Sequence, residues 1–392
     1  MAGPPEDRDR RRPALPLRFA GKLGVLPRPG RKSVRFRRST GHVSGVRKFL
    51  GRRRSHRELI LKDHEMDHQT ADDIISKSME FLGEENFGAA IDELTLGLQL
   101  HPHHPRMLYM KGCAHAGRGD VNEAISAYRE SAKYAGEMAA NPLYNLANLY
   151  RDLNDVSNAI DCYKMTIAIN PNCSDAWINM GSILDDNGQS QAALECYEAA
   201  LLIDTEDHIT WSNRGNSLRT LGRYEEAENS FGKAIALNEN DLAAQIGIAV
   251  CRAHRGDESC IAILEATYSK TRDQRVLFEL ATVLAKFGRH EDALECYDLL
   301  VEQGMDEAAM WNNRGECLAR LHRVEDSLAS FDAAIVANRE YLPAYFGKAR
   351  VLVGAGRRPE AKNLVITMLQ FASEEFVAEP AVQALISLVR AE

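Results

Sequence analysis

Polar and apolar positions along this chain follow a pattern that is itself repeated. Clear copies read WINMGSILDDNGQSQAALECYEAALLID from Trp177 and WSNRGNSLRTLGRYEEAENSFGKAIALN from Trp211, with apolar residues spaced as on one face of a helix. Nine copies begin near residues 71, 105, 140, 174, 208, 242, 274, 308 and 342, a period close to 34. A fixed period of this size predicts a pair of helices stacked on copies of itself over residues 71–375.

Three positions in each copy predict how the helices pack. The eighth position holds a small residue in every copy, such as Gly181 and Gly215. The twentieth is Ala in seven of the nine copies, and the twenty-fourth is a ring in six of them. Two helices cross closely only where side chains are small, so the eighth and twentieth positions are expected to face each other. The ring is expected to fill the gap between neighbouring copies.

Turn residues separate the predicted helices. Gly188, Gly222, Gly288 and Gly356 stand at the same place in their copies. Pro102 and Pro171 end second helices, because proline cannot continue a helix. After the last copy, residues 376–392 carry an apolar stripe that predicts a C-terminal capping helix.

The arrangement of Trp177, Gly181, Ala193 and Tyr197 resembles the tetratricopeptide repeat family. The resemblance extends over about three quarters of the chain. It implies an all-α fold, a right-handed α-solenoid of about nine helix pairs. It also implies that the first helix of each pair lines a concave groove.

Charge divides the chain into two dissimilar parts. Residues 1–62 hold 19 Lys and Arg residues against four acidic ones, a balance of +15, whereas the remainder holds 29 basic and 52 acidic residues, a balance of −23. Residues 1–65 are rich in Pro, Gly and Arg and show no helical period, so we expect them to be disordered.

Several roles for this basic segment stay open. Residues 1–57 could bind nucleic-acid phosphates, or serve as a nuclear or organellar address. They could be a solvated charged tail without a specific role. They could also be a dispensable extension, or sequence upstream of a true start at Met66.

Candidate chemistry is sparse along the rest of the chain. The eight cysteines contain no CxxC pair, and three of them share one repeat position beside the packing ring. We found no sequence motif for a phosphate loop, a metalloprotease or a serine hydrolase, and His101, His103 and His104 are interpreted as a solvated turn. No run of eighteen apolar residues suggests a membrane span. These patterns predict a cytoplasmic protein that is not an enzyme and has no cofactor or metal.

Function is therefore expected on the concave groove. The candidate peptide-binding residues are Tyr144, Asn145, Asn148, Arg151, Asn179, Asn213, Asn216, Arg219 and Asn313. Asn recurs at the sixth position of four copies, and its amide can pair with the backbone of an extended peptide. The pattern resembles the asparagine ladder of O-linked N-acetylglucosamine transferases. The alternative is that these amides bond between neighbouring copies and hold the solenoid together.

Together these features predict an adaptor that binds an extended peptide or protein segment in the groove. The alternative is a nucleic-acid-associated factor whose Arg-rich arm binds phosphates while the repeats recruit a protein. The partner and the oligomeric state are not specified by the sequence.

Overall fold

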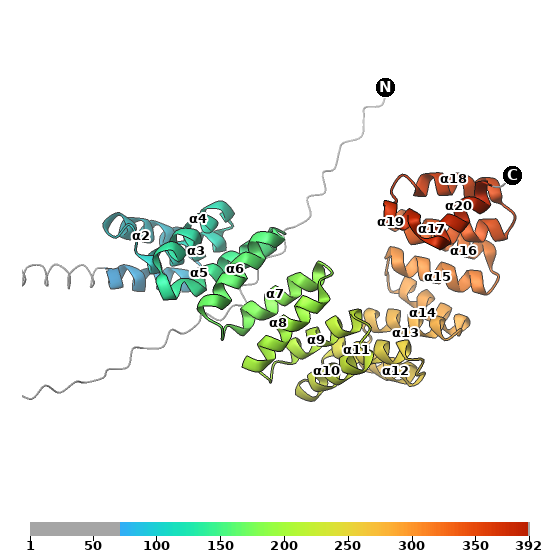
Figure 1. Ribbon diagram of the computed structural model, residues 1–392, viewed down its shortest axis with the longest axis horizontal. Helices are drawn as coiled ribbons and strands as arrows, with labels where there is room; N and C mark the ends of the chain where they lie inside the picture. Colours follow the sequence, from blue (N-terminus) through green and yellow to red (C-terminus); the bar gives the residue numbers. More distant parts are fainter. Residues whose placement is uncertain (1–70, 391–392) are drawn as a thin grey trace, which may run out of the picture. The chain divides into compact units, whose positions relative to one another are not determined.

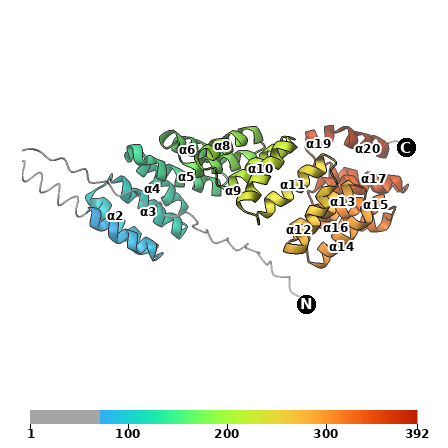
Figure 2. The same cartoon turned by 90° about the horizontal axis from the view of Figure 1, so that it is seen from below.

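A computed structural model describes residues 71–390, and all regular structure in that range is helical. These residues fall into two compact units that divide between Ile169 and Asn170. The predictions made for residues 1–65 lie outside the described residues. Figures 1 and 2 show consecutive helices of each unit running back and forth beside one another. The predicted all-α solenoid is confirmed.

The first unit contains three helix pairs in the part of the chain that the structure describes. Residues 71–83 are helical and precede the second helix of the first pair. The helices that follow are α2 (Phe87–Leu100), α3 (Pro105–Arg118), α4 (Val121–Tyr134), α5 (Ala140–Asp152) and α6 (Val156–Ile169), with a short 3-10 helix at Gly136–Ala139.

The second unit contains six helix pairs followed by two further helices. They are α7 (Ser174–Asp186), α8 (Ser190–Ile203), α9 (His208–Thr220), α10 (Tyr224–Leu237), α11 (Leu242–His254), α12 (Ser259–Thr271), α13 (Gln274–Lys286), α14 (His290–Glu302), α15 (Ala308–Arg320), α16 (Val324–Ala337), α17 (Leu342–Gly354), α18 (Arg358–Met368), α19 (Glu374–Ala378) and α20 (Pro380–Arg390). Helix α20 packs on α17 and α18 through its buried apolar side.

Small residues and rings meet where the sequence places them. A Cβ atom added at Gly215 would lie 2.7 Å from the ring of Phe231, and one at Gly181 would lie 2.8 Å from the ring of Tyr197. Such distances leave no room for a side chain, so the first helix can approach the ring only because the eighth position is small. The rings of Phe231 and Tyr197 are buried almost completely.

The turns inside the pairs also follow the sequence. Gly188, Gly222, Gly288 and Gly356 all have positive φ angles, between 73° and 79°. In that region a Cβ atom would be strained, which explains why glycine ends these first helices.

A side chain at the fourth position of several copies ties each first helix to the loop before it. The indole Nε1 of Trp177 donates to the carbonyl of Pro171 at 3.2 Å, and that of Trp211 donates to the carbonyl of Thr205 at 2.9 Å. Gln245 does the same through its amide, at 2.7 Å to the carbonyl of Glu239. In each case the acceptor lies six residues upstream, so the loop carbonyl is satisfied without an ordered water.

Candidate functional site

The candidate groove consists of the inner faces of the first helices. In the second unit α7, α9, α11, α13, α15 and α17 contact one another in that order. The family resemblance implies that side chains at the second, fifth, sixth, ninth, twelfth and thirteenth positions of each copy face inward.

In the first unit, Asn145 of α5 bonds to the protein itself. Its amide nitrogen lies 3.1 Å from the hydroxyl of Tyr109 and 3.5 Å from that of Tyr128. Burial raises the pKa of both tyrosines, so their hydroxyls stay protonated at neutral pH. Asn145 therefore links the second and third helix pairs by hydrogen bonds.

The neighbouring predicted residues on α5 are also engaged. The hydroxyl of Tyr163 donates to the Oδ1 atom of Asn148 at 2.5 Å. The ring of Tyr144 contacts the ring of Tyr163, with centroids 6.0 Å apart. Arg151 is exposed and pairs with its neighbour Asp152 at 3.0 Å. Much of the polar capacity of α5 is thus used locally.

In the second unit, Asn179 lies half-buried on α7, whereas Asn213, Asn216 and Arg219 lie half-buried on α9. Neither the Asn213 nor the Asn216 side chain makes a hydrogen bond to another residue in the described range. The ring corresponding to Tyr128 is Tyr197 here, and its hydroxyl lies against the carboxylate of Asp185 instead. The α9 amides therefore keep their hydrogen-bonding groups unused within the described residues.

The surroundings of Asn313 on α15 resemble those of Asn145. The Asn313 side chain lies near the hydroxyl of Tyr297 in the preceding helix pair and opposes the rise that burial causes in the pKa of that tyrosine. The amide nitrogen of Asn312 also donates to the Oδ1 atom of Asn313 at 3.3 Å.

The sixth position depends on the ring of the preceding copy. Tyr128 and Tyr297 are each followed by Asn, at positions 145 and 313. Phe231 is followed instead by Gly247, where an added Cβ atom would lie 2.5 Å from the ring. Phe331 is followed by Gly347, where the corresponding distance is 2.6 Å. In these four copies a ring with a hydroxyl is followed by an amide, and a ring without one is followed by glycine. Asn213 also follows a tyrosine, Tyr197, but its side chain makes no hydrogen bond to that hydroxyl.

Sequence reasoning missed the inner residues of α11 and α13. Ile246 and Val250 of α11 and Phe278 and Glu279 of α13 are half-buried, and they occupy the same repeat positions as the predicted residues. The signal that could have found them is the repeat register itself, extended beyond the copy that begins at residue 208.

Charges gather around α11. Burial raises the pKa of the Glu279 carboxyl, and the charge of Arg219 on α9 opposes that rise. Burial lowers the pKa of His254, and the charges of Lys286 and Arg219 lower it further. Arg219 therefore lies close enough to α11 and α13 to act on ionisable groups of both helices.

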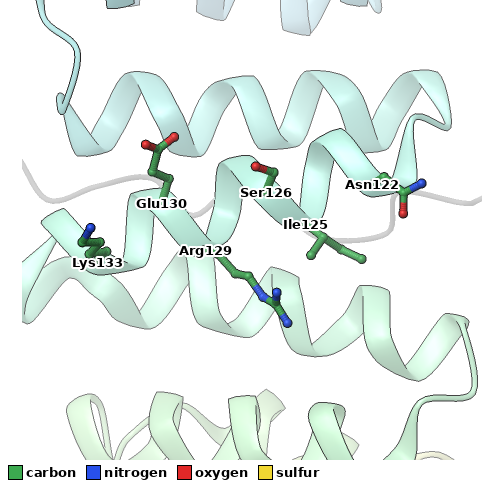
Figure 3. Close-up of a pocket in the computed structure, with 6 residues that line it drawn as sticks. All are labelled: Asn122, Ile125, Ser126, Arg129, Glu130 and Lys133. Carbon is green, nitrogen blue, oxygen red and sulfur yellow. The ribbon is translucent and has the colours of Figure 1, made fainter.

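Two surface hollows lie outside the inner face. One, of about 390 Å³, is lined by six residues of α4 that include Arg129 and Glu130. Figure 3 shows that these side chains spread along one helix and do not converge on a point. The other, of about 820 Å³, lies among α8, α9 and α10. It contains Leu202, which is 87% exposed. It also contains Trp211, whose ring centroid lies 4.2 Å from the Nζ atom of Lys233.

The described residues offer neither a metal cluster nor a membrane-spanning helix. Residues 71–390 contain no group of three His, Cys, Asp or Glu side chains placed to hold a metal ion. Among the helices that the structure describes, none is long and apolar enough to cross a membrane. All eight cysteines are free thiols.

Comparison with known families gives matches along most of the described chain. Family models described as tetratricopeptide repeat match residues 77–138, 140–173, 174–207, 208–241 and 278–343. The photosystem I assembly protein Ycf3 of two Prochlorococcus marinus strains, NATL2A and NATL1A, is 33% and 32% identical over 85 residues. Each match covers 21% of this chain and 49% of the relative, so the chain spans about half the length of these relatives.

Solved structures share the fold at low sequence identity. A tetratricopeptide repeat protein from Parabacteroides merdae is 18% identical with a TM-score of 0.51, over 72% of this chain and 99% of that one. Yeast Tom70 is 15% identical with a TM-score of 0.50, over 80% of this chain and 88% of that one. At such identities the likeness concerns the fold alone.

Proposed function

Because the chain belongs to the tetratricopeptide repeat family, we propose that it is a non-enzymatic adaptor that holds an extended peptide or protein segment on the inner faces of its first helices. A role in protein interaction agrees with the family and with a relative that is named an assembly protein. The choice of the inner face rests on the bonding state of its side chains.

The observation that carries the proposal is the unused bonding capacity on α9. Asn213, Asn216 and Arg219 are half-buried, yet within residues 71–390 their side chains make no hydrogen bond or ion pair. Cations on the same or an equivalent helix but off the inner face are paired. Arg214 lies 2.9 Å from Glu198, and Arg314 lies 2.8 Å from Asp298. Half-buried polar groups without partners are well suited to bind a partner's backbone and side chains.

The test compares two triple variants of the full chain. Asn213→Ala, Asn216→Ala and Arg219→Ala together remove the inner polar face of α9. Each lost hydrogen bond should weaken binding by about 0.5–1.5 kcal/mol, so affinity for peptides selected from a random library should fall roughly ten-fold or more. The melting temperature should stay within about 2 °C, because no internal bond is lost.

The matched control removes the outer hollow on the same unit. Leu202→Ala, Asn229→Ala and Lys233→Ala should leave the selected peptides bound with wild-type affinity. The opposite pattern, with binding lost in the outer variant and kept in the inner one, would place the partner on the outer face and contradict the proposal.

A further inference from the structure

Arg219 and Glu279 lie on the two first helices that flank α11, and both are half-buried at repeat positions predicted to face inward. Arg219 lies near the end of α9, and Glu279 lies on α13; both helices pack against α11. The half-buried inner positions of α11 between them hold Ile246 and Val250. We call these four residues the saddle. Its floor is apolar, and its two sides carry opposite charges.

The charge of Arg219 acts on Glu279 without forming an ion pair with it. The guanidinium of Arg219 acts on the Glu279 carboxyl, so the two share one electrostatic environment. Neither side chain makes a hydrogen bond or a salt bridge to any residue in the described range. Elsewhere in the second unit opposite charges close into pairs, as Arg252 does with Glu228 at 2.7 Å and Arg314 with Asp298 at 2.8 Å. Helix α11 keeps Arg219 and Glu279 apart.

Burial makes the unpaired carboxylate costly. Glu279 is half-buried, and loss of hydration disfavours its ionised form. A cation delivered by a partner would offset that cost. On the α9 side, the guanidinium of Arg219 favours an anionic group. His254 adds no charge there, because burial and the charges of Lys286 and Arg219 lower its pKa and keep the imidazole neutral at neutral pH.

We infer that the saddle binds a peptide segment carrying two opposite charges, with an acidic side chain toward Arg219 and a basic side chain toward Glu279. The inference rests on the proposed function, because it names the chemistry of the partner segment. Apolar atoms between the two charges would lie on Ile246 and Val250. The order of the two charges along the segment would then fix its direction across α11.

A nucleic acid fits this surface poorly. The chain beyond residue 62 carries a net charge of −23, which repels a polyanion, and Glu279 stands inside the saddle itself. A segment with one acidic and one basic side chain is neutral overall and satisfies both sides.

The experiment selects short random peptides on the full-length chain and on charge-swapped variants. Wild type should enrich an acidic and a basic residue at a fixed spacing. The double variant Arg219→Glu with Glu279→Lys should enrich the same spacing with the charges reversed. For one enriched peptide, replacing its acidic residue by the amide should weaken binding roughly 10–100-fold in wild type, and hardly at all in Arg219→Ala.

Two controls separate this inference from the proposed function. The pair Arg358→Glu and Glu265→Lys makes the same charge changes at exposed sites on second helices, and it should leave the selected motif unchanged. Val250→Arg places a bulky cation on the floor and should abolish peptide binding. If wild type enriches peptides that Val250→Arg no longer binds, but the motif carries no charge or ignores the swap, the saddle inference is wrong and groove binding stands.

If wild type enriches no peptide over Val250→Arg, both proposals fall. If a single-stranded oligonucleotide displaces the selected peptides from wild type but not from Arg219→Glu, the occupant is a nucleic acid and the inference is overturned.

Discussion

Two junctions between helix pairs solve the same packing problem with different residues. In the first unit, the ring of Tyr128 is followed by Asn145, whose amide nitrogen lies 3.5 Å from the tyrosine hydroxyl. In the second unit, the ring of Phe231 is followed by Gly247, where an added Cβ atom would lie 2.5 Å from the ring. The first junction is held by a polar contact, and the second by close approach of a bare backbone.

The difference shows that the sixth repeat position is set by the ring before it. An amide is useful there when the ring has a hydroxyl to satisfy. Without a hydroxyl, glycine lets the next helix close on the ring. Asn213 departs from both cases, because the hydroxyl of Tyr197 lies against Asp185 and leaves the amide to other partners. The same residue type therefore links two helix pairs at position 145 and makes no side-chain hydrogen bond within the described residues at position 213.

The largest effect is expected from filling the glycine junction. Gly247→Leu would force a side chain into the fully buried ring of Phe231, and we expect unfolding free energy to fall by up to roughly 3 kcal/mol. Urea unfolding followed by circular dichroism measures it. Gly232→Ala on α10 is the control: nothing lies within 4 Å of its added Cβ, so stability should rise by about 0.5–1 kcal/mol. Equal unfolding of Gly247→Leu and wild type would refute the close junction.

A smaller effect should separate the two asparagines. Asn145→Ala leaves the partly buried hydroxyls of Tyr109 and Tyr128 without their amide partner, which should cost about 1–2 kcal/mol of stability. Asn213→Ala breaks no internal side-chain bond and should change stability by less than about 0.5 kcal/mol. The same urea titration compares both variants. If both variants lose stability equally, Asn213 also stabilises the fold, and the proposed difference between the two asparagines is wrong.

The smallest effect concerns alkaline pH and touches only the tyrosine junction. Burial raises the pKa of Tyr128 above its ordinary value of 10.0, so the folded state holds this proton more tightly than the unfolded state does. The stability that results from this difference is fully present below pH 10. As the pH rises above 10, the free energy of unfolding falls by no more than about 1.4 kcal/mol per pH unit. Tyr128→Phe should therefore flatten the decline of stability above pH 10.

The control for the pH experiment is Tyr134→Phe at the end of α4, where the ring is 37% exposed. Its profile above pH 10 should follow wild type. Because Cys113 lies in the same cluster and burial raises its pKa as well, Cys113→Ala in both backgrounds removes the thiol contribution. A Tyr128→Phe profile parallel to wild type would show that the hydroxyl does not differ between the two states.

The fold was predictable because its determinants are local and repeated. Gly181 with Tyr197, and Gly215 with Phe231, are pairs at fixed spacing within one copy, and the structure brings each pair into contact. The bonding of the candidate site was not predictable in the same way. Whether Asn145 faces a ligand depends on hydroxyls of Tyr109 and Tyr128, which come from another helix pair. The electrostatic environment of Glu279 depends on Arg219, which lies two helix pairs earlier in the chain. Such contacts form only when copies stack, so the sequence of a single copy does not predict them.

The ties made by Trp177, Trp211 and Gln245 have a consequence for how such a chain can be cut and rejoined. Each donor reaches a carbonyl six residues upstream, so the joint before a first helix belongs to the copy that follows it. If a module began at the first helix, its indole or amide would follow a loop from another copy. The hydrogen bond to its own loop carbonyl would then be lost. A module that can be exchanged intact therefore begins earlier, at the residue that supplies the loop carbonyl. When such modules are duplicated or grafted, each keeps the hydrogen bond between its loop and its first helix.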